Sequence, residues 1–452
     1  MTKKSRLIIL LVCVVCFFVV APMLVAYSMG YRYDFEKNKI VATGGIYVRT
    51  FPSAGQITID SNISQKPGFL ANSIFVQSLL PKNHTVSIKK DGYYDYFKTL
   101  PVKENEVTKL ENVLLIKNSI GFKNLADKVD YFSIAPNNQN IITATTNAKN
   151  ITFSYFSLGS TSPAQTFSII QTEKISDIKW SNDSTKALIN IQNSGNNFYY
   201  LFDTAQVVTP LKKLSAVRLP YLDKTTQQVS FNPQNSKELF FVKNKILYSA
   251  INNKTLAVIK NLNTYKFSSN NITWLSADGS LYSSDIAGKL IEQLTVKNIA
   301  PIPTQNYQIF ILPGKTLLQA DNFLFVLNQD KKTLEDITPP ETNYKIIDSL
   351  DENKNLNLIF WNSSKIYLYS FADKKFTELF SGTDIKNCQW INNGYIIFND
   401  NDKIIISEID YRGNINAITL SKTAPDIYFN PQDGKLYILA NNTLSSSDKI
   451  TP

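Results

Sequence analysis

The residue types that carry most acid–base and metal chemistry are scarce in this chain. The only histidine is His84, and no cysteine or acidic residue stands beside it at the spacing of a metal site. Histidine-dependent catalytic triads and histidine-rich zinc sites are therefore excluded unless another chain contributes. His84 directly precedes a predicted strand, so we interpret it as a structural residue of a small β domain.

Two polar segments carry enough oxygen atoms to bind calcium. They are residues 351–355 (Asp-Glu-Asn-Lys-Asn) and residues 399–402 (Asn-Asp-Asn-Asp). Neither has the glycine and distal glutamate of a calcium loop, so we interpret both as hairpin turns. No glycine-rich phosphate loop or dinucleotide fingerprint is present. The sequence therefore predicts no catalytic residue, no cofactor-binding residue and no metal ligand.

Aromatic and acidic residues leave two other chemistries to consider. Paired carboxylates of a glycosidase cannot be recognised by spacing, because distant segments can meet in the fold. Tryptophans could form a surface on which sugars stack, but these lie at strand ends in repeated units, which favours core packing. The four are Trp180, Trp274, Trp361 and Trp390.

A repeat of about 40 residues supplies the elements that would position any site. Residues 427–439 (Ile-Tyr-Phe-Asn-Pro-Gln-Asp-Gly-Lys-Leu-Tyr-Ile-Leu) read as a strand, a tight turn and a second strand. Residues 229–241 repeat this pattern almost residue for residue. Gly279 and Gly434 each follow an aspartate, and we predict positive φ angles for both.

This period predicts a β-propeller over residues 118–452, because a four-stranded blade takes about 40 residues. The count of units favours eight blades, with seven as the alternative. The last unit lacks a strand, and we predict that the apolar run 113–116 (Val-Leu-Leu-Ile) completes it. This part resembles the broad class of WD-repeat-like propellers, which holds binding proteins and enzymes alike. Units are predicted to open near Val129, Ile175, Gln227, Asn271, Tyr307, Lys345, Ile385 and Asp426.

The N-terminus predicts a membrane anchor. Lys3, Lys4 and Arg6 precede an uncharged apolar run over residues 7–29. This run is long enough to cross a bilayer, so we expect an uncleaved transmembrane helix. The basic cluster indicates a cytoplasmic tail over residues 1–6, with the bulk of the protein outside. Cleavage after Ala26, as in a signal peptide, is the alternative.

A connector (residues 30–45) and a compact β domain (residues 46–117) are expected next. Four segments resemble the pattern of the PEGA domain, although Ala54 and Gly55 stand in inverted order and Asn83 replaces a common glycine. The resemblance implies a β-sandwich in an envelope-associated protein, and it does not imply an enzyme. The segments are residues 52–55 (Pro-Ser-Ala-Gly), 57–60 (Ile-Thr-Ile-Asp), 80–88 (Leu-Pro-Lys-Asn-His-Thr-Val-Ser-Ile) and 90–93 (Lys-Asp-Gly-Tyr).

Composition and charge complete the expectation. A 452-residue chain with 43% hydrophobic residues can bury more than one core, and the net charge of +10 is spread through a lysine-rich sequence. We expect an all-β protein on the outer side of the cell membrane that binds or scaffolds envelope components. Its partner would be an envelope protein, a glycan or an anionic wall polymer, with no nucleic acid and no cofactor. The alternative is a propeller hydrolase or lyase that acts on wall polymers.

Overall fold

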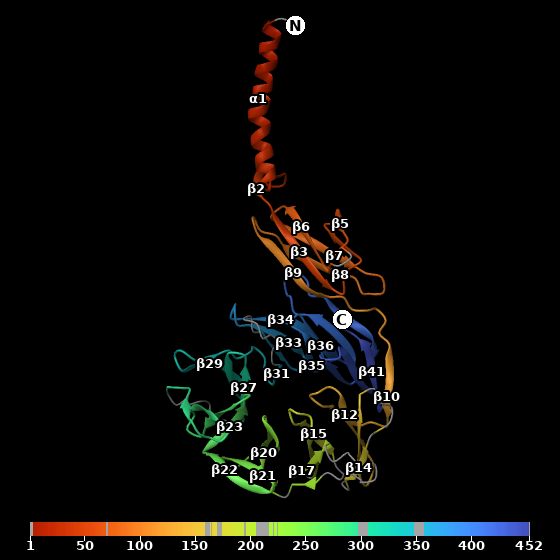
Figure 1. The fold of residues 1–452 in the computed structure, drawn as a ribbon, viewed down its shortest axis with the longest axis vertical. Helices are drawn as coiled ribbons and strands as arrows, with labels where there is room; N and C mark the ends of the chain where they lie inside the picture. The colour runs from red at the N-terminus through yellow and green to blue at the C-terminus, as the bar shows by residue number, and fades with distance from the viewer. Residues whose placement is uncertain are drawn as a thin grey trace.

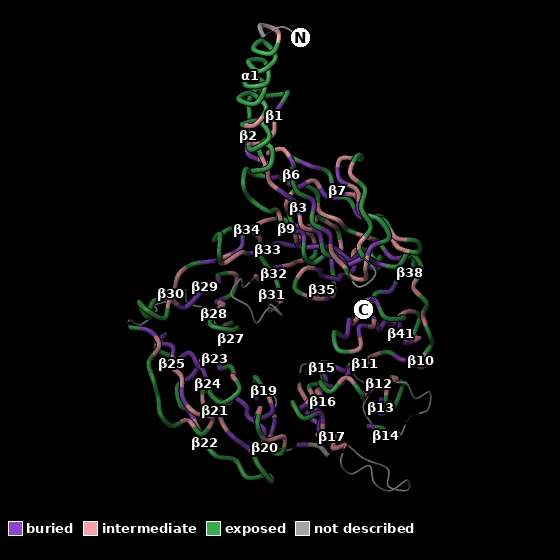
Figure 2. The backbone as a smooth tube through the Cα atoms, turned by 45° about the horizontal axis from the view of Figure 1, so that its top comes forward, coloured by how far each residue is buried: buried purple, intermediate pink, exposed green. Residues whose placement is uncertain are grey.

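Three parts follow one another in space as they do in the sequence: a helix, a β-sandwich and a ring of blades (Figure 1). The computed structural model describes residues 3–68, 71–158, 163, 165–169, 174–193, 196–204, 217–219, 221–223, 225–296, 306–347 and 357–451. Figure 2 shows that buried residues gather in the sandwich and the blades, whereas the helix is exposed along its length.

Helix α1 (Lys3–Ser28) contains the apolar N-terminal run. Its segment Ser5–Ser28 is long and apolar enough to cross a membrane, and none of that segment is buried against the rest of the protein. The predicted connector is a hairpin of β1 (Tyr31–Asp34) and β2 (Lys39–Ala42) and not a plain extended strand. Asn38 allows the tight turn because it adopts a positive φ of 49°.

Two sheets form the sandwich, in the strand orders β6-β3-β9 and β5-β4-β7-β8. Alternate side chains along β7 are buried, as expected for a strand with one face on a core. These buried faces meet in a single apolar cluster. The strands are β3 (Gly44–Phe51), β4 (Gln56–Ile59), β5 (Ile63–Gln65), β6 (Ser73–Leu79), β7 (Asn83–Lys89), β8 (Tyr96–Pro101) and β9 (Val107–Leu114).

The ring consists of eight four-stranded antiparallel sheets, so the preferred count of eight blades is correct. Blade 1 consists of β11 (Tyr131–Ile134), β12 (Asn140–Thr146), β13 (Ile151–Ser157) and β14 (Gln165–Ile169), and blade 2 of β15 (Lys174–Trp180), β16 (Lys186–Asn193), β17 (Asn196–Asp203) and β18 (Val217–Arg218). Blade 3 consists of β19 (Gln227–Asn232), β20 (Asn235–Lys243), β21 (Ile246–Ile251) and β22 (Lys254–Lys260), and blade 4 of β23 (Leu262–Phe267), β24 (Asn271–Ser276), β25 (Leu281–Asp285) and β26 (Glu292–Gln293).

Blade 5 consists of β27 (Tyr307–Leu312), β28 (Lys315–Ala320), β29 (Phe323–Asn328) and β30 (Thr333–Asp336). Blade 6 consists of β31 (Lys345–Ile347), β32 (Asn357–Trp361), β33 (Lys365–Ser370) and β34 (Lys375–Ser381). Blade 7 consists of β35 (Ile385–Asn392), β36 (Tyr395–Asp400), β37 (Lys403–Glu408) and β38 (Ala417–Thr423). Blade 8 combines β39 (Asp426–Asn430), β40 (Lys435–Ala440) and β41 (Thr443–Lys449) with β10 (Phe122–Asp127) from the start of the ring.

Ring closure therefore uses a strand from the N-terminal side, but the predicted donor 113–116 is wrong. The donor is β10, which pairs antiparallel with β41. Residues 113–116 are apolar for another reason, because the chain passes between two cores there. Val113 and Leu115 point into the sandwich core, whereas Leu114 and Ile116 point into the core shared by blades 7 and 8.

Each pair of neighbouring blades shares an apolar core, and these cores run without a break around the ring. Polar side chains on the first strands add ties between blades. Lys179 Nζ donates to the Val229 carbonyl of the next blade at 3.3 Å, and Gln389 Nε2 donates to the Ile427 carbonyl at 3.0 Å. Among the described residues, each blade of the closed ring therefore packs against both of its neighbours.

One predicted blade opening is wrong. Blade 4 begins at Leu262 and not near Asn271, which starts its second strand. The aromatic residue before the turn marks the end of the first strand in most units, but Trp274 lies on the second strand β24. No proline or glycine separates β22 from β23, because the positive φ of Asn261 makes that turn. The other seven openings agree with the predicted positions within two residues.

The turn glycines provide a test of the blade geometry. Gly434 and Gly279 have φ angles of 69° and 89°, which confirms their predicted conformation. Gly434→Ala should lower the free energy of unfolding by more than the ~1 kcal/mol expected for a left-handed residue, because the new Cβ would collide with the Thr451 hydroxyl. Gly314→Ala is the matched control, since Gly314 has the same φ of 69° and open space around it. Equal losses in urea unfolding would contradict this account of the Gly434 turn.

Candidate functional site

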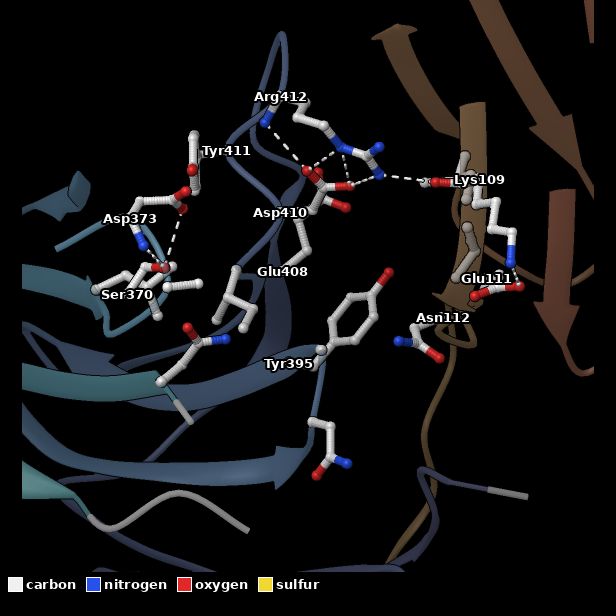
Figure 3. Close-up of a pocket in the computed structure, with 18 of the residues that line it drawn as sticks. Lys109, Glu111, Asn112, Ser370, Asp373, Tyr395, Glu408, Asp410, Tyr411 and Arg412 are labelled. Carbon is white, nitrogen blue, oxygen red and sulfur yellow. Dashed lines mark hydrogen bonds and ion pairs between the residues drawn. The ribbon is translucent and has the colours of Figure 1, made fainter. Parts of the chain in front are cut away.

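A cleft of about 450 Å³ lies where the sandwich meets blades 6 and 7, and we call it the interdomain cleft. Figure 3 shows its walls: β9 of the sandwich on one side, and the loop after β37 on the other. The lining residues from the sandwich are Tyr96 and residues 109–113. Those from the ring are Asn357, Leu368, Ser370, Ala372, Asp373, Asn393, Gly394, Tyr395 and residues 408–412.

Behind this cleft, a buried ion pair joins the two domains. Lys98 on β8 is 0% exposed, and its Nζ lies 2.6 Å from Oε1 of Glu408 at the end of β37. The same ammonium group donates to the backbone carbonyls of Asp410 and Asn414. All three N–H bonds of the ammonium group therefore have acceptors, and all of these come from the propeller.

The Glu408 carboxylate is equally well satisfied. The Tyr96 hydroxyl donates to its Oε2 at 2.8 Å, and the backbone and side-chain nitrogens of Asn416 donate to Oε1, each at 2.8 Å. Burial, and then the charge of Glu408, raise the pKa of Tyr96 far above its ordinary value. Tyr96 is therefore a neutral hydrogen-bond donor at physiological pH, which is the form that the carboxylate requires.

A second charged pair holds the outer side of the contact. Arg412 donates from Nη2 to Asp410 Oδ2 at 2.7 Å and to the Lys109 carbonyl of the sandwich at 2.9 Å. Burial alone would raise the pKa of Asp410, but the hydrogen bonds from Arg412 and the charges of Lys98 and Arg412 hold that pKa below its ordinary value. Asp410 is therefore a carboxylate that orients Arg412 toward the sandwich.

The loop between β37 and β38 also covers the open edge of β8. Asn414 and Asn416 each donate to the Phe97 carbonyl at 2.8 Å, and the Thr99 N–H donates to Asn414 Oδ1 at 3.2 Å. Gly413 has a φ of 65°, and any Cβ there would collide with the Thr99 carbonyl oxygen. The loop thus replaces the missing neighbour strand of a sheet edge, which would otherwise be open to pairing with another chain.

The accessible part of the cleft is polar and suits binding better than acid–base chemistry. Glu408 and Asp410 already accept hydrogen bonds from cations and amides, so neither is placed to act as a general acid or base. The groups at the mouth include Ser370, which donates to Asp373 at 2.9 Å, and Tyr411, which is 40% exposed. Such a surface can offer hydrogen bonds and an aromatic ring to a partner.

The single histidine lies within the sandwich and does not line this cleft. His84 is 3% exposed; its Nδ1 lies 2.5 Å from Asp60 Oδ2, and its Nε2 lies 2.7 Å from the Leu80 carbonyl oxygen. The imidazole joins the turn at Asp60 to the start of β7, which agrees with its interpretation as a structural residue. Sequence spacing did not reveal Asp60 as its acidic partner, because the two residues meet across the sheet.

The tryptophans pack as predicted. Trp274 and Trp390 are buried, and Trp180 and Trp361 are half-buried against the cores between blades. Trp180 Nε1 also donates to the Ser133 hydroxyl of blade 1 at 3.1 Å, so its polar edge is used within the ring. No sugar-stacking surface is formed by these four residues.

Of the two predicted polar turns, residues 351–355 lie outside the described residues. Residues 399–402 join β36 to β37 as a hairpin turn, with positive φ angles at Asn401 and Asp402. The Asp400 carboxylate accepts hydrogen bonds from the backbone N–H groups of Thr383 and Asp384. Within the described part of the chain, no group of three or more histidine, cysteine or acidic residues could hold a metal ion.

Sequence reasoning missed every residue of the ion pair. A signal for Lys98 was present, because it shares the inward face of β8 with Tyr96 and Leu100 while Phe97 points outward. A lysine on the apolar face of an alternating strand needs a buried acceptor. Glu408 gave a similar signal, since it ends the buried strand β37 (Lys403–Glu408). Nothing in the sequence showed that these two strands face each other.

Removing the Lys98 ammonium group should destabilise the sandwich and the propeller together. We expect Lys98→Met to lower the free energy of unfolding by ~3–5 kcal/mol, because Glu408 would remain buried without its cation. The double variant Lys98→Met/Glu408→Gln should recover part of this loss in a double-mutant cycle. Lys386→Met, which breaks an exposed pair with Asp384, is the control and should change stability little. Additive losses in the cycle would show that the two residues are not coupled.

The contact between the sandwich and the propeller should also weaken at acidic pH. The pKa of Asp410 is lower in the folded protein than in the unfolded chain. Its contribution to the free energy of unfolding is therefore fully present above the ordinary aspartate pKa of ~4, and it is lost as the pH falls through the lower pKa of the folded state. Asp410→Asn should therefore be less stable than the wild type at pH 7, and this difference should shrink toward pH 3. Urea unfolding across this range provides the measurement, and a difference that stays constant would rule out this role for Asp410.

A comparison with known protein families identifies the sandwich domain. Residues 43–118 match the PEGA domain family. No curated protein sequence matches the chain. Among solved structures, Saccharomyces cerevisiae Sqt1 aligns with a TM-score of 0.48 and 12% identity, covering 74% of this chain and 98% of that one. The Cps50 (Swd1) β-propeller domain of Myceliophteria thermophila aligns with a TM-score of 0.41 and 10% identity, covering 74% and 100%. The chain therefore carries a PEGA domain, and its own sheet topology shows that this domain is followed by an eight-bladed β-propeller.

Proposed function

We propose that this protein is a membrane-anchored scaffold of the cell envelope that presents its propeller as an interaction platform. The observation that carries the proposal is the buried contact between the PEGA domain and blade 7, centred on Lys98 and Glu408. Because this contact uses charged groups fully removed from water, the two domains form one body in a defined orientation. The anchor helix lies at one end of this body and the ring at the other (Figure 1).

The sequence around the helix supports an orientation with the bulk of the protein outside. Lys3, Lys4 and Arg6 precede the apolar span, and basic residues of this kind favour the cytoplasmic side. Arg32 follows the span, where its guanidinium group stacks on the Tyr27 ring at 3.5 Å. Aromatic and basic side chains are typical of the boundary between lipid and water. The domains would then extend from the outer surface of the membrane.

The chemistry of the interdomain cleft favours a binding role over the alternative of a wall-polymer hydrolase or lyase. A glycosidase-type site built on acidic residues needs a carboxyl group that is free to exchange a proton with substrate. The buried Glu408 is held by Lys98, Tyr96 and Asn416, and Asp410 is held by Arg412. Their role is to fix the domains, which leaves the outer surfaces of the blades for an envelope protein or an anionic wall polymer.

Protease treatment of intact cells, with an epitope tag fused after Pro452, tests the topology. We expect the tagged chain to fractionate with membranes, and external protease to remove the mass beyond Gly30. A cytoplasmic protein followed in the same cells must stay intact as the control. A soluble full-length chain, or a tag protected from protease, would contradict the proposal.

Photo-crosslinking in cells tests the scaffold role. A photoreactive residue replacing Tyr411, at the mouth of the cleft, or Leu256, which is 71% exposed on blade 3, should give discrete crosslinked species with envelope components. The same residue at the buried position of Phe398 serves as a control that should give none. If neither exposed position yields a crosslinked species, the platform role is wrong even when the topology is correct.

A further inference from the structure

A second concavity, of about 730 Å³, lies on the outer part of the ring between blades 5 and 6. We call it the lysine pocket. Strands β28, β29 and β30 provide one wall and strands β33 and β34 the other, and Figure 2 shows these strands in neighbouring blades. The lining residues on which the argument rests are Lys315, Lys331, Lys374, Glu335, Phe371 and Phe376.

Aromatic rings form one side of this pocket. The ring centroid of Tyr369 lies 5.0 Å from that of Phe371 and 4.7 Å from that of Phe376. Tyr369 is buried, whereas Phe371 and Phe376 are half-buried and keep part of their rings open to the cavity. A ring or apolar face of a ligand can pack on these surfaces in the way that aromatic side chains bind flat groups.

Three lysines surround the same cavity: Lys315, Lys331 and Lys374. Within the described residues, none of them forms an ion pair. Lys315 Nζ lies 5.6 Å from the centre of the Phe371 ring, so a cation sits beside the aromatic surface. The pKa of Glu335 lies below its ordinary value, chiefly because Asn328 donates a hydrogen bond to its carboxylate. Desolvation opposes this shift, and the charges of all three lysines add to it.

The carboxylates of the pocket are already used by neutral donors. Asn328 Nδ2 donates to Glu335 Oε1 at 2.7 Å, and the Thr338 N–H donates to Asp336 Oδ1 at 2.8 Å. Neither acid forms an ion pair with the three lysines, although the charges of these lysines act on Glu335, so the ammonium groups remain available to an external anion. The pocket thus combines unpaired cations with open aromatic surface, and this combination fits a ligand that is both anionic and ring-shaped.

We propose that the lysine pocket binds an acidic sugar chain, in which sugar rings pack on Phe371 and Phe376 while carboxylate or phosphate groups contact the three lysines. This inference deepens the proposed function by naming the chemistry of a partner. It rests on that function only for the location in which the protein meets this partner. A strand-forming acidic peptide is the competing occupant, because two edge strands border the pocket, β30 (Thr333–Asp336) and β34 (Lys375–Ser381), and the hexaglutamate probe below tests for it.

Titration calorimetry on the full chain in a neutral detergent tests the proposal. The probe is a hexuronic acid trisaccharide, compared with a neutral trisaccharide of the same linkage, the hexuronic acid monomer, inorganic phosphate and a hexaglutamate peptide. We expect binding of the acidic trisaccharide, none of the neutral one, and a loss of affinity as salt screens the exposed lysines. The monomer distinguishes a site for a chain from one for a free sugar acid, since a chain carries several acidic groups and can contact more than one lysine at once.

Two variants locate the binding. Lys315→Gln/Lys331→Gln should weaken binding of the acidic trisaccharide about tenfold, as expected when charge-assisted contacts are lost. Phe371→Ala should weaken it through lost ring packing without changing the salt dependence. The control is Lys254→Gln/Lys260→Gln, which removes the same charge from exposed positions of β22 on blade 3. Thermal melting of each variant, compared with the wild type, shows that the ring remains folded.

Four outcomes would overturn the proposal. The first two are no binding of the acidic trisaccharide and equal binding of the neutral one. The others are tighter binding of hexaglutamate or of phosphate alone, and unchanged affinity in the pocket variants. Because calorimetry uses purified protein, such a result leaves the membrane topology and the crosslinking of the platform as separate questions, and the two proposals can fail independently.

Discussion

The ion pair between Lys98 and Glu408 is the interaction on which the arrangement of the two domains depends. Removing both charges from water is costly, and that cost is offset only because every donor and acceptor of the pair is satisfied. The partners of Lys98 all lie in blade 7, so the pair forms only when the PEGA domain sits in one position. A purely apolar contact would tolerate sliding, whereas this set of hydrogen bonds specifies a single orientation.

The chain connection reinforces the same geometry. Residues 113–116 alternate between the core of the sandwich and the core of blades 7 and 8, so the link between the domains is itself part of both cores. Only a few residues later, β10 enters the ring as the outer strand of blade 8 and pairs with β41 near the C-terminus. The PEGA domain is therefore fixed to the part of the ring where the two ends of the propeller are joined, and ring closure and domain docking support each other.

The sequence predicted the fold well where local chemistry repeats. The strand-turn-strand units, the positive φ of Gly434 and the structural role of His84 all follow from residue types within a short window. The predicted donor of the closing strand was wrong because apolar residues at 113–116 signal burial but not which core they enter. The ion pair could not be predicted, because Lys98 and Glu408 are 310 residues apart in the sequence. The lysine pocket was equally hidden, since its cations and aromatic rings come from two blades.

The most direct test of the account is the distance between the PEGA domain and the propeller in solution. Spin labels on cysteines replacing the exposed residues Lys66 of the sandwich and Lys260 of blade 3 report this distance once the native cysteines are replaced. A rigid contact predicts a single narrow distribution in the wild type, which broadens when Lys98 is changed to methionine. A broad or two-peaked distribution in the otherwise wild-type protein would contradict the claim that the two domains form one body.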